Sequence, residues 1–322
     1  MFPSKDQLTI CFAHAAYQMK NRFDARQTGI RNFEVRAYDE LQKRIGEADV
    51  VVVSGMWKND LIAHAPKLRF IQSISSGMDQ YSKEQLGAKK VRLASAAGVN
   101  ARAVAEHAMA LILAVARRLP EARDNQHKKT WRGMIGDLAE REDELGGKTL
   151  LVVGMGRIGS HLARLANAFD MKVIGIRRDP AQGSNGADSI HAMGDLVKLV
   201  PQADFVALTC ALTPETTGLM SAAAFVAMKP SSVFVNVARG KVADEAALIE
   251  TMKAGRIWAA AIDVTADEPL PAASPLWTMP NVFITPHTAG ETRRYEDNVL
   301  DILVENLERL WRGETSLRNQ VL

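Results

Sequence analysis

The chain has 322 residues, 47% of them hydrophobic, and a formal net charge of +3. This length fills one large core or two ordinary ones, and we expect two domains. Positive and negative side chains nearly balance and form no long run of one sign, which argues against a nucleic-acid-binding arm or an acidic tail. We therefore expect small molecules and further copies of this chain as partners.

Neither the N-terminus nor the most apolar segment indicates secretion or a membrane span. No apolar stretch with a small-residue cleavage site begins the chain, so we expect no secretory signal. The run AMALILAVA (108–116) is flanked by charged residues and is too short to cross a bilayer. Cys11 and Cys210 lie far apart, so neither a disulfide framework nor a metal site is expected. The sequence thus favours a cytoplasmic protein without membrane contact.

Short apolar runs of strand character alternate with stretches of helical period in the first third of the chain. These runs are QLTICFA (7–13), DVVVVS (49–54), LRFIQSIS (68–75) and VRLASA (91–96). Strands spaced this way predict a parallel sheet wrapped by helices. One long helix should follow over 101–119, after the N-cap Asn100 and before Pro120. The polar segment 120–143, with Trp131 and Met134 as its main apolar residues, is expected to be an exposed arm or a subunit contact.

A second alternating series begins after the arm. Its strands are expected at TLLVV (149–153), KVIGI (172–176), DFVALT (204–209), SVFVNV (232–237), IWAAAID (257–263) and NVFIT (281–285). Six such strands predict one doubly wound α/β unit. The chain closes with a stretch of helical period over 293–313. One stripe of this helix is formed by Val299, Ile302, Leu303, Asn306, Leu307 and Leu310.

A glycine motif follows the first strand of this second series. Gly154, Gly156 and Gly159 form GxGxxG between an apolar strand and a helical stretch, which is the context of a dinucleotide-binding turn. The first glycine allows the tight turn, the second lets backbone N–H groups approach a pyrophosphate, and the third allows close packing of helix on strand. The motif predicts a nicotinamide dinucleotide as cofactor.

The end of the next strand indicates which dinucleotide is bound. An NAD site usually places an acidic residue there to bind the ribose hydroxyls, whereas this chain has Arg177 and Arg178. A guanidinium grips a 2′-phosphate through charge-assisted hydrogen bonds. We therefore expect NADP in preference to NAD. The alternative is that both arginines lie on a solvated loop, where Asp179 partly cancels their charge or contacts the ribose.

Three residues at the ends of later strands suit hydride transfer to a carbonyl. His287 in FITPHTAG and Glu268 in DVTADEPLP follow successive strands, and a carboxylate beside an imidazole favours its protonated, proton-donating form. Arg239 in VNVARGKVADEAAL offers a fixed positive charge to a substrate carboxylate. Other histidines, including His107 and His161, are expected to be structural or solvated.

With these motifs the chain resembles the D-isomer-specific 2-hydroxyacid dehydrogenases over nearly its whole length. The resemblance implies two doubly wound α/β domains, a Rossmann cofactor domain (102–289) inserted into a flavodoxin-like substrate domain (1–101 and 290–322). It also implies that Arg239 binds and polarises a 2-oxo acid, that His287 donates and accepts the proton, and that Glu268 pairs with His287. The further cofactor contacts that it implies are Arg157, Ile158, Thr213, Pro214, Thr216, Asp263 and Gly290.

The resemblance extends to the substrate and to assembly. SISSGMD (73–79) matches the family loop whose backbone N–H groups, around Ser76 and Gly77, receive the substrate carboxylate, although the family's usual Gly-Val-Gly-x-Asp is changed here. Trp57 is expected either to face the same substrate or to cap a hydrophobic edge. The long helix and the arm resemble the family's dimer-forming region, which implies a homodimer.

Family members with arginine at the position of Arg177 and Arg178 resemble glyoxylate and hydroxypyruvate reductases. We therefore expect NADPH-dependent reduction of a small 2-oxo acid. Formate dehydrogenases carry glutamine where this chain has Glu268, which disfavours that activity. Phosphoglycerate dehydrogenases share the core, but those with regulatory extensions need sequence that is missing here. A redox-sensing corepressor of the same fold is an alternative of a different class; it would bind the nucleotide without turnover.

Overall fold

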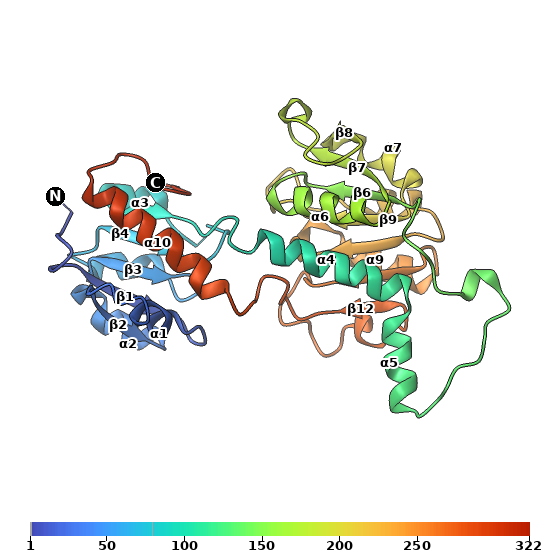
Figure 1. Cartoon of the computed structure of the whole chain (residues 1–322), viewed down its shortest axis with the longest axis horizontal. Coiled ribbons are helices and arrows are strands. Elements are labelled where there is room, and N and C mark those ends of the chain that lie inside the picture. The colour runs from blue at the N-terminus through green and yellow to red at the C-terminus, as the bar shows by residue number, and fades with distance from the viewer. Residues whose placement is uncertain (1, 79) are drawn as a thin grey trace. The chain divides into compact units, whose positions relative to one another are not determined.

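The computed structural model describes residues 2–78 and 80–322, which form two compact units (Figure 1). Unit 1 comprises residues 2–78, 80–100 and 292–322, and unit 2 comprises residues 101–291. Each unit is a parallel β-sheet with helices on both faces, so the predicted α/β fold class is confirmed. Among the described residues no helix combines the length and the apolar character that a membrane crossing requires.

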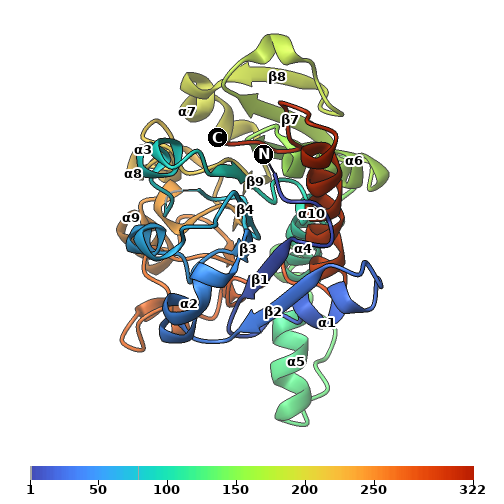
Figure 2. The same cartoon turned by 90° about the vertical axis from the view of Figure 1, so that its left-hand side faces the viewer.

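The sheet of unit 1, as far as it is described, has the strand order β2-β1-β3-β4-β5, and all its pairs are parallel (Figure 2). This is the flavodoxin-like order, in which the direction of winding switches between β1 and β3. Its strands are β1 (Thr9–Ala13), β2 (Arg31–Val35), β3 (Val50–Val53), β4 (Phe70–Ser73) and β5 (Arg92–Ala94).

Helices cover both faces of this sheet because its strands are apolar on both sides. Ile10 and Phe12 of β1 pack in one core, whereas Cys11 and Ala13 pack in the other. The first core is closed by α1 (Met19–Asp24) and α10 (Tyr295–Trp311). The second is closed by α2 (Tyr38–Arg44) and α3 (Lys83–Ala88). The expected stripe of α10 is confirmed from Val299 to Leu307, which are buried together with the amide of Asn306.

The sheet of unit 2 has the order β12-β11-β10-β9-β6-β7-β8 in the described chain, again all parallel. Counted from β6, this is the Rossmann order with one added edge strand, and the winding switches between β6 and β9. The strands are β6 (Thr149–Val153), β7 (Lys172–Arg177), β8 (Ser189–Ala192), β9 (Phe205–Leu208), β10 (Val233–Asn236), β11 (Ala259–Ile262) and β12 (Val282–Ile284).

Both faces of this second sheet are also buried. On one face α4 (Ala101–Ala116) and α6 (Arg157–Ala168) pack against Leu150 and Val152 of β6 (Figure 1). Leu151 and Val153 point to the opposite core. The helices of that core are α7 (Leu196–Leu199), α8 (Ala222–Ala227) and α9 (Glu245–Lys253). Strands buried on both sides read as continuous apolar runs, which is why the sequence located them.

Two expectations about these elements were wrong. The strands β2 and β8 were not expected, because both are edge strands of mixed polarity, RNFEV and SIHA, with partly exposed side chains. The helix expected over 101–119 ends at Ala116, where Arg118 adopts a left-handed φ of 50° and a second helix, α5 (Leu119–His127), begins. Pro120 belongs to the first turn of α5, where a missing N–H costs nothing.

Candidate functional site

The glycine turn at the end of β6 has the geometry that its sequence predicts. Gly154 has a φ of +110°, and a Cβ there would lie 2.5 Å from the backbone nitrogen of Cys210. A Cβ on Gly159 would lie 2.3 Å from the carbonyl oxygen of Gly154. Both positions therefore exclude any side chain, because the turn packs on the end of β9 and α6 packs on the turn. This is the point at which the winding of the sheet switches.

Gly156, the middle glycine, has a different environment. A Cβ at this position would meet no described atom within 4 Å, so the turn is open on that side. Gly156 is also the N-cap of α6, where backbone N–H groups and the helix dipole favour an anion. Arg157 begins α6, and Ile158 packs on the core of unit 2. These residues fit the pyrophosphate of a dinucleotide.

The two arginines at the end of β7 differ in their surroundings. Arg177 donates from Nη1 to the carbonyl oxygen of Gly183 at 3.0 Å, so its guanidinium lies along the following loop. Arg178 is exposed. Asp179 uses its carboxylate to accept from the backbone N–H of Ala181 at 3.1 Å. The acidic residue thus caps its own turn.

The loop after β9 lies close to Arg178. Thr216 accepts from the backbone N–H of Thr213 at 2.7 Å and donates to the carbonyl oxygen of Ala211 at 2.7 Å, which fixes the turn that contains exposed Pro214. The pKa of Glu215 is lowered, chiefly by a hydrogen bond from Thr213 and further by the charge of Arg178. Because β7 and β9 belong to the same parallel sheet, the predicted cofactor segments that follow them lie at one edge of it.

Arg239 follows β10 in a turn that a buried amide holds. Asn236 donates to the carbonyl oxygen of Arg239 at 3.2 Å and accepts from the N–H of Ala238 at 3.0 Å. The Arg239 side chain is exposed. The next residue, Gly240, packs on the backbone of Thr265. The arginine turn and the turn that follows β11 are thereby joined.

Glu268 and His287 form a direct pair. Nδ1 of His287 lies 2.6 Å from Oε2 of Glu268, and the side chains are 43% and 37% exposed. The other carboxylate oxygen of Glu268 accepts from the backbone N–H of Thr265 at 3.2 Å, so the acid is oriented by the turn that contacts Gly240. Because Nδ1 is held by the carboxylate, Nε2 is the ring atom left for chemistry.

Asp263 holds the backbone that carries His287. Its side chain is 1% exposed, and its carboxylate accepts from the N–H groups of Thr288 and Ala289, each at 3.0 Å. Its carbonyl oxygen accepts from the N–H of His287 at 2.8 Å. His287 has a left-handed φ of 56°, a conformation that costs on the order of 1–3 kcal/mol for such a residue. These bonds offset that strain. Gly290 follows as a half-buried turn residue.

In unit 1 the predicted carboxylate loop follows β4. Ser76 is exposed, and Gly77 accepts at its carbonyl oxygen from the hydroxyl of Ser75 at 2.9 Å. Ser75 in turn accepts from the hydroxyl of Ser54, at the end of β3, at 2.9 Å. The loop after β4 is therefore joined to the end of β3 by hydrogen bonds. Asp79, the last residue of the predicted motif, lies outside the described residues.

Trp57 does not have the position expected of a substrate contact. Its side chain is in the core beside Leu61 and Tyr81, with 2% of its surface exposed. Its indole N–H donates to Asn59 at 3.1 Å. The alternative expectation, a cap on a hydrophobic edge, agrees with this burial. Trp57 is not part of the site proposed below.

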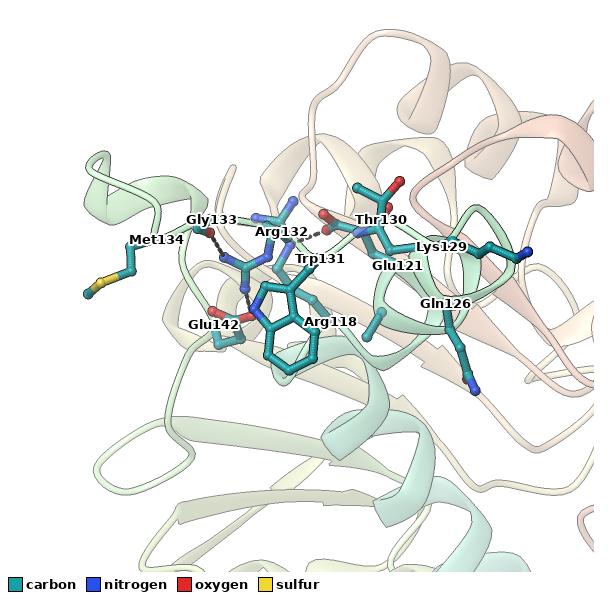
Figure 3. Close-up of a pocket in the computed structure, with 12 residues that line it drawn as sticks. Arg118, Glu121, Gln126, Lys129, Thr130, Trp131, Arg132, Gly133, Met134 and Glu142 are labelled. Carbon is teal, nitrogen blue, oxygen red and sulfur yellow. Dashed lines mark hydrogen bonds and ion pairs between the residues drawn. The ribbon is translucent and has the colours of Figure 1, made fainter.

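α5 and the segment that follows it form a pocket of about 700 Å³ (Figure 3). Arg118, Glu121, Arg132 and Glu142 provide ion pairs in its wall. The pocket contains none of the residues predicted for the cofactor or the substrate. The large apolar side chains that the arm exposes are Trp131, Met134 and Leu138, and α5 exposes Leu119 at its start.

Several residues that organise the site were not predicted. Asn236 and Ser75 donate to carbonyl oxygens of the site turns, and Ser54 donates to the hydroxyl of Ser75. The backbone N–H of Thr265 donates to the carboxylate of Glu268. Asn236 is signalled in SVFVNV as a polar residue inside an apolar run. The other three occur in ordinary turns, where the sequence carries no comparable signal. No group of three or more acidic, histidine or cysteine side chains in the described chain is arranged to hold a metal.

Comparisons with known proteins agree with this geometry. Residues 109–289 match the model of the D-isomer specific 2-hydroxyacid dehydrogenase, NAD binding domain. The chain is 37% identical over 283 residues to glyoxylate/hydroxypyruvate reductase B of Escherichia fergusonii, covering 87% of this chain and 86% of that protein. It is 36% identical over 285 residues to D-3-phosphoglycerate dehydrogenase of Methanocaldococcus jannaschii, covering 86% of this chain but only 52%, about half, of that longer protein.

A solved structure agrees over almost the whole chain. The NADPH-dependent glyoxylate/hydroxypyruvate reductase of Sinorhizobium meliloti, in complex with NADP and malonate, superposes with a TM-score of 0.81. The sequence identity is 25%, and 98% of this chain and 97% of that chain are covered. The matched domain, the similarity to these relatives and the site at the strand ends lead to one conclusion. The chain belongs to the D-isomer specific 2-hydroxyacid dehydrogenase family and is an oxidoreductase with a nicotinamide cofactor.

Proposed function

We propose that this enzyme uses NADPH to reduce a small 2-oxo acid of the glyoxylate or hydroxypyruvate type to the D-2-hydroxy acid. The observation that carries the proposal is the 2.6 Å contact between Nδ1 of His287 and Oε2 of Glu268. This contact leaves Nε2 to transfer a proton. The pair follows strands of the same parallel sheet as the glycine turn, and such sheets bind their ligands at the carboxyl ends of the strands.

The proposed roles follow from charge development during reduction. When bound, NADPH would supply the hydride for the carbonyl carbon. As negative charge grows on the carbonyl oxygen, His287 donates the Nε2 proton to it. Glu268 stabilises the imidazolium before transfer and holds the ring in one orientation. Arg239 binds the substrate carboxylate and polarises the carbonyl through its positive charge.

A further proposed substrate contact is the loop that follows β4. The backbone N–H groups around Ser76 and Gly77 would receive the carboxylate of the 2-oxo acid. Support comes from the hydroxyls of Ser54 and Ser75, which fix this loop to the ends of β3 and β4. A loop held by its own side chains loses little entropy when it binds a small anion.

The preference for NADP is proposed from the end of β7. Asp179 uses its carboxylate to cap the following turn, so an acidic group is turned away from the role that it has in NAD sites. Arg178 is exposed and its charge acts on Glu215 in the loop after β9. A 2′-phosphate between these segments would gain charge-assisted hydrogen bonds, with Arg177 bracing the loop through Gly183.

We also propose that the enzyme is a homodimer formed through the arm. Trp131 and Met134 have 99% and 102% of their surface exposed, and Trp, Met and Arg are enriched in protein interfaces. Exposure of these two large apolar side chains to water is unfavourable, so their burial in an interface would be stabilising. A symmetric pairing of arms would bury both copies of this surface.

A matrix of initial rates tests the proposed activity. NADH and NADPH are each measured against glyoxylate, hydroxypyruvate, pyruvate, phenylpyruvate and 3-phosphohydroxypyruvate. We expect the highest kcat/KM with NADPH and glyoxylate or hydroxypyruvate. The similarity to a D-3-phosphoglycerate dehydrogenase makes that activity the second candidate, and a clear preference for 3-phosphohydroxypyruvate would establish it instead. Nucleotide binding without turnover of any acid would identify a sensor rather than an enzyme.

A further inference from the structure

His107 contacts the segment that carries the proposed proton donor. It lies in α4, and its Nε2 is 2.9 Å from Oγ1 of Thr285 and 3.5 Å from Oδ1 of Asp263. The imidazole is 24% exposed. The sequence predicted a structural or solvated residue, because nothing in AVAEHAMA indicates that His107 contacts a strand end about 180 residues later in the chain.

The direction of these hydrogen bonds follows from the number of protons. Oγ1 of Thr285 lies 2.6 Å from Oδ1 of Asp263, and a carboxylate only accepts, so the single hydroxyl proton of Thr285 points to Asp263. The threonine oxygen then has only lone pairs to offer to His107. Nε2 of His107 must therefore carry a proton and donate it. His107 therefore donates to Thr285, and Thr285 donates to Asp263.

Asp263 is the last acceptor in this series of hydrogen bonds, and it also supports the backbone of His287. Its carboxylate and carbonyl oxygens accept from the N–H groups of three successive residues, His287, Thr288 and Ala289. A rotation of the carboxylate would break the bonds to Thr288 and Ala289 together. The hydroxyl of Thr285 is the side-chain group that fixes the carboxylate against such a rotation.

We propose that His107 is a positioning residue: by donating to Thr285 it fixes the Asp263 carboxylate, and through it the left-handed backbone that directs the imidazole of His287. The inference rests on the proposed role of His287. His107 itself touches neither substrate nor reacting atoms in this proposal. Its effect on the reaction is entirely through the geometry of the 285–289 segment.

The test compares variants that delete or retain the donor. His107→Leu removes the Nε2 proton, whereas His107→Gln places an amide N–H at a similar reach. We expect His107→Leu to lower kcat by about 10-fold to 100-fold, the range for misplacement of a catalytic group. The KM for NADPH should change less than kcat, because the glycine turn and the arginines at the end of β7 are not touched. His107→Gln should recover most of the lost kcat.

A double-mutant cycle shows whether His107 acts through Thr285. Thr285→Val removes the hydroxyl at similar volume and should reproduce the loss, while Thr285→Ser should retain most of the activity. His107→Leu combined with Thr285→Val should be no slower than either single variant, since both substitutions interrupt the same series of hydrogen bonds. His161→Leu, a substitution of another half-buried histidine in unit 2, is the control and should keep wild-type kcat.

Amide hydrogen exchange gives a readout that does not depend on turnover. The peptide covering residues 285–291 should exchange faster in His107→Leu than in wild type and His107→Gln, with peptides of α6 unchanged. If the wild-type enzyme reduces none of the acids, the proposed function has failed, and this exchange pattern still decides whether His107 holds the segment.

Three results would overturn the inference. They are a His107→Leu variant with a lower Tm but normal kcat, equal losses in the Leu and Gln variants, and unchanged exchange over 285–291. If His107→Leu does not fold, the Thr285→Val and Thr285→Ser pair decides by the same criteria.

Discussion

Gly240 packs backbone to backbone on Thr265. A Cβ at position 240 would lie 1.9 Å from the carbonyl carbon of Thr265 and 2.0 Å from its oxygen. Gly240 is required here for space. The contact joins the turn of Arg239 to the turn from which Glu268 reaches His287. Two of the proposed catalytic groups therefore depend on the absence of one side chain.

Gly240→Ala should consequently damage both folding and activity. The methyl group has to push apart two backbones, and overpacking of this kind costs about 1–3 kcal/mol of the free energy of unfolding. We expect a lower Tm and a kcat/KM reduced by at least about tenfold, because Arg239 and Glu268 separate. Gly194→Ala is the control, since a Cβ there meets no described atom within 4 Å. If Gly240→Ala keeps the wild-type Tm and kcat/KM, the two turns can move apart without cost, which would contradict the prediction.

His287→Ala should abolish most turnover and leave nucleotide binding intact. General acid catalysis by a placed group contributes about 10²–10⁴-fold, and kcat should fall within that range. The Kd for NADPH, from the change in its fluorescence, should stay near the wild-type value because the glycine turn is unaffected. Turnover close to normal would remove His287 from the mechanism.

Glu268→Gln should lower kcat. Oε2 of Glu268 lies 2.6 Å from Nδ1 of His287, and glutamine removes the negative charge from this hydrogen bond. A hydrogen bond to a charged group contributes about 1.5–3 kcal/mol, so we expect kcat to fall by at least about tenfold, with the Kd for NADPH unchanged. Glu84→Gln, which alters an exposed glutamate of α3, serves as the control and should keep the wild-type kcat. An unchanged kcat in Glu268→Gln would contradict the pairing.

Replacement of Arg177 and Arg178 by serine should change cofactor preference. A hydrogen bond to a charged group contributes about 1.5–3 kcal/mol, so the KM for NADPH should rise by at least about tenfold in the double variant. The KM for NADH should change little, since NADH has no 2′-phosphate. Arg178→Ser alone should account for most of the effect, because Arg177 also bonds to Gly183. Equal changes with both cofactors would remove the phosphate argument.

Substitution of Trp131 and Met134 by lysine should dissociate the proposed dimer. Both side chains are exposed on the arm, and two added charges on each copy would repel in a symmetric contact. Sedimentation at several concentrations should show a dimer for the wild type and a monomer for the double variant. Val226→Lys, which alters an exposed apolar residue of α8 outside the arm, should leave the dimer intact. A wild-type monomer at micromolar concentration would contradict the proposal.

The sequence by itself determined the sheets and the order of the site residues. Strands of a doubly wound sheet are apolar on both faces, so β6 and β10 appear as continuous apolar runs, and the glycine motif marks the turn after β6. Because parallel strands end at one edge, Arg239, Glu268 and His287 were expected at a common edge from chain order alone. The edge strands β2 and β8 were missed because they are paired on one side and retain polar residues.

Only the tertiary structure decided which groups support the site. The contact of His107 with Thr285 joins residues 178 positions apart in the chain, and the fit of Gly240 on Thr265 depends on the spacing of two neighbouring strands. Likewise, Trp57 packs in the core because its neighbours Leu61 and Tyr81 converge on it. A local pattern fixes which elements form and where their ends lie. The distances between side chains on different elements follow from packing, which no single segment of the sequence contains.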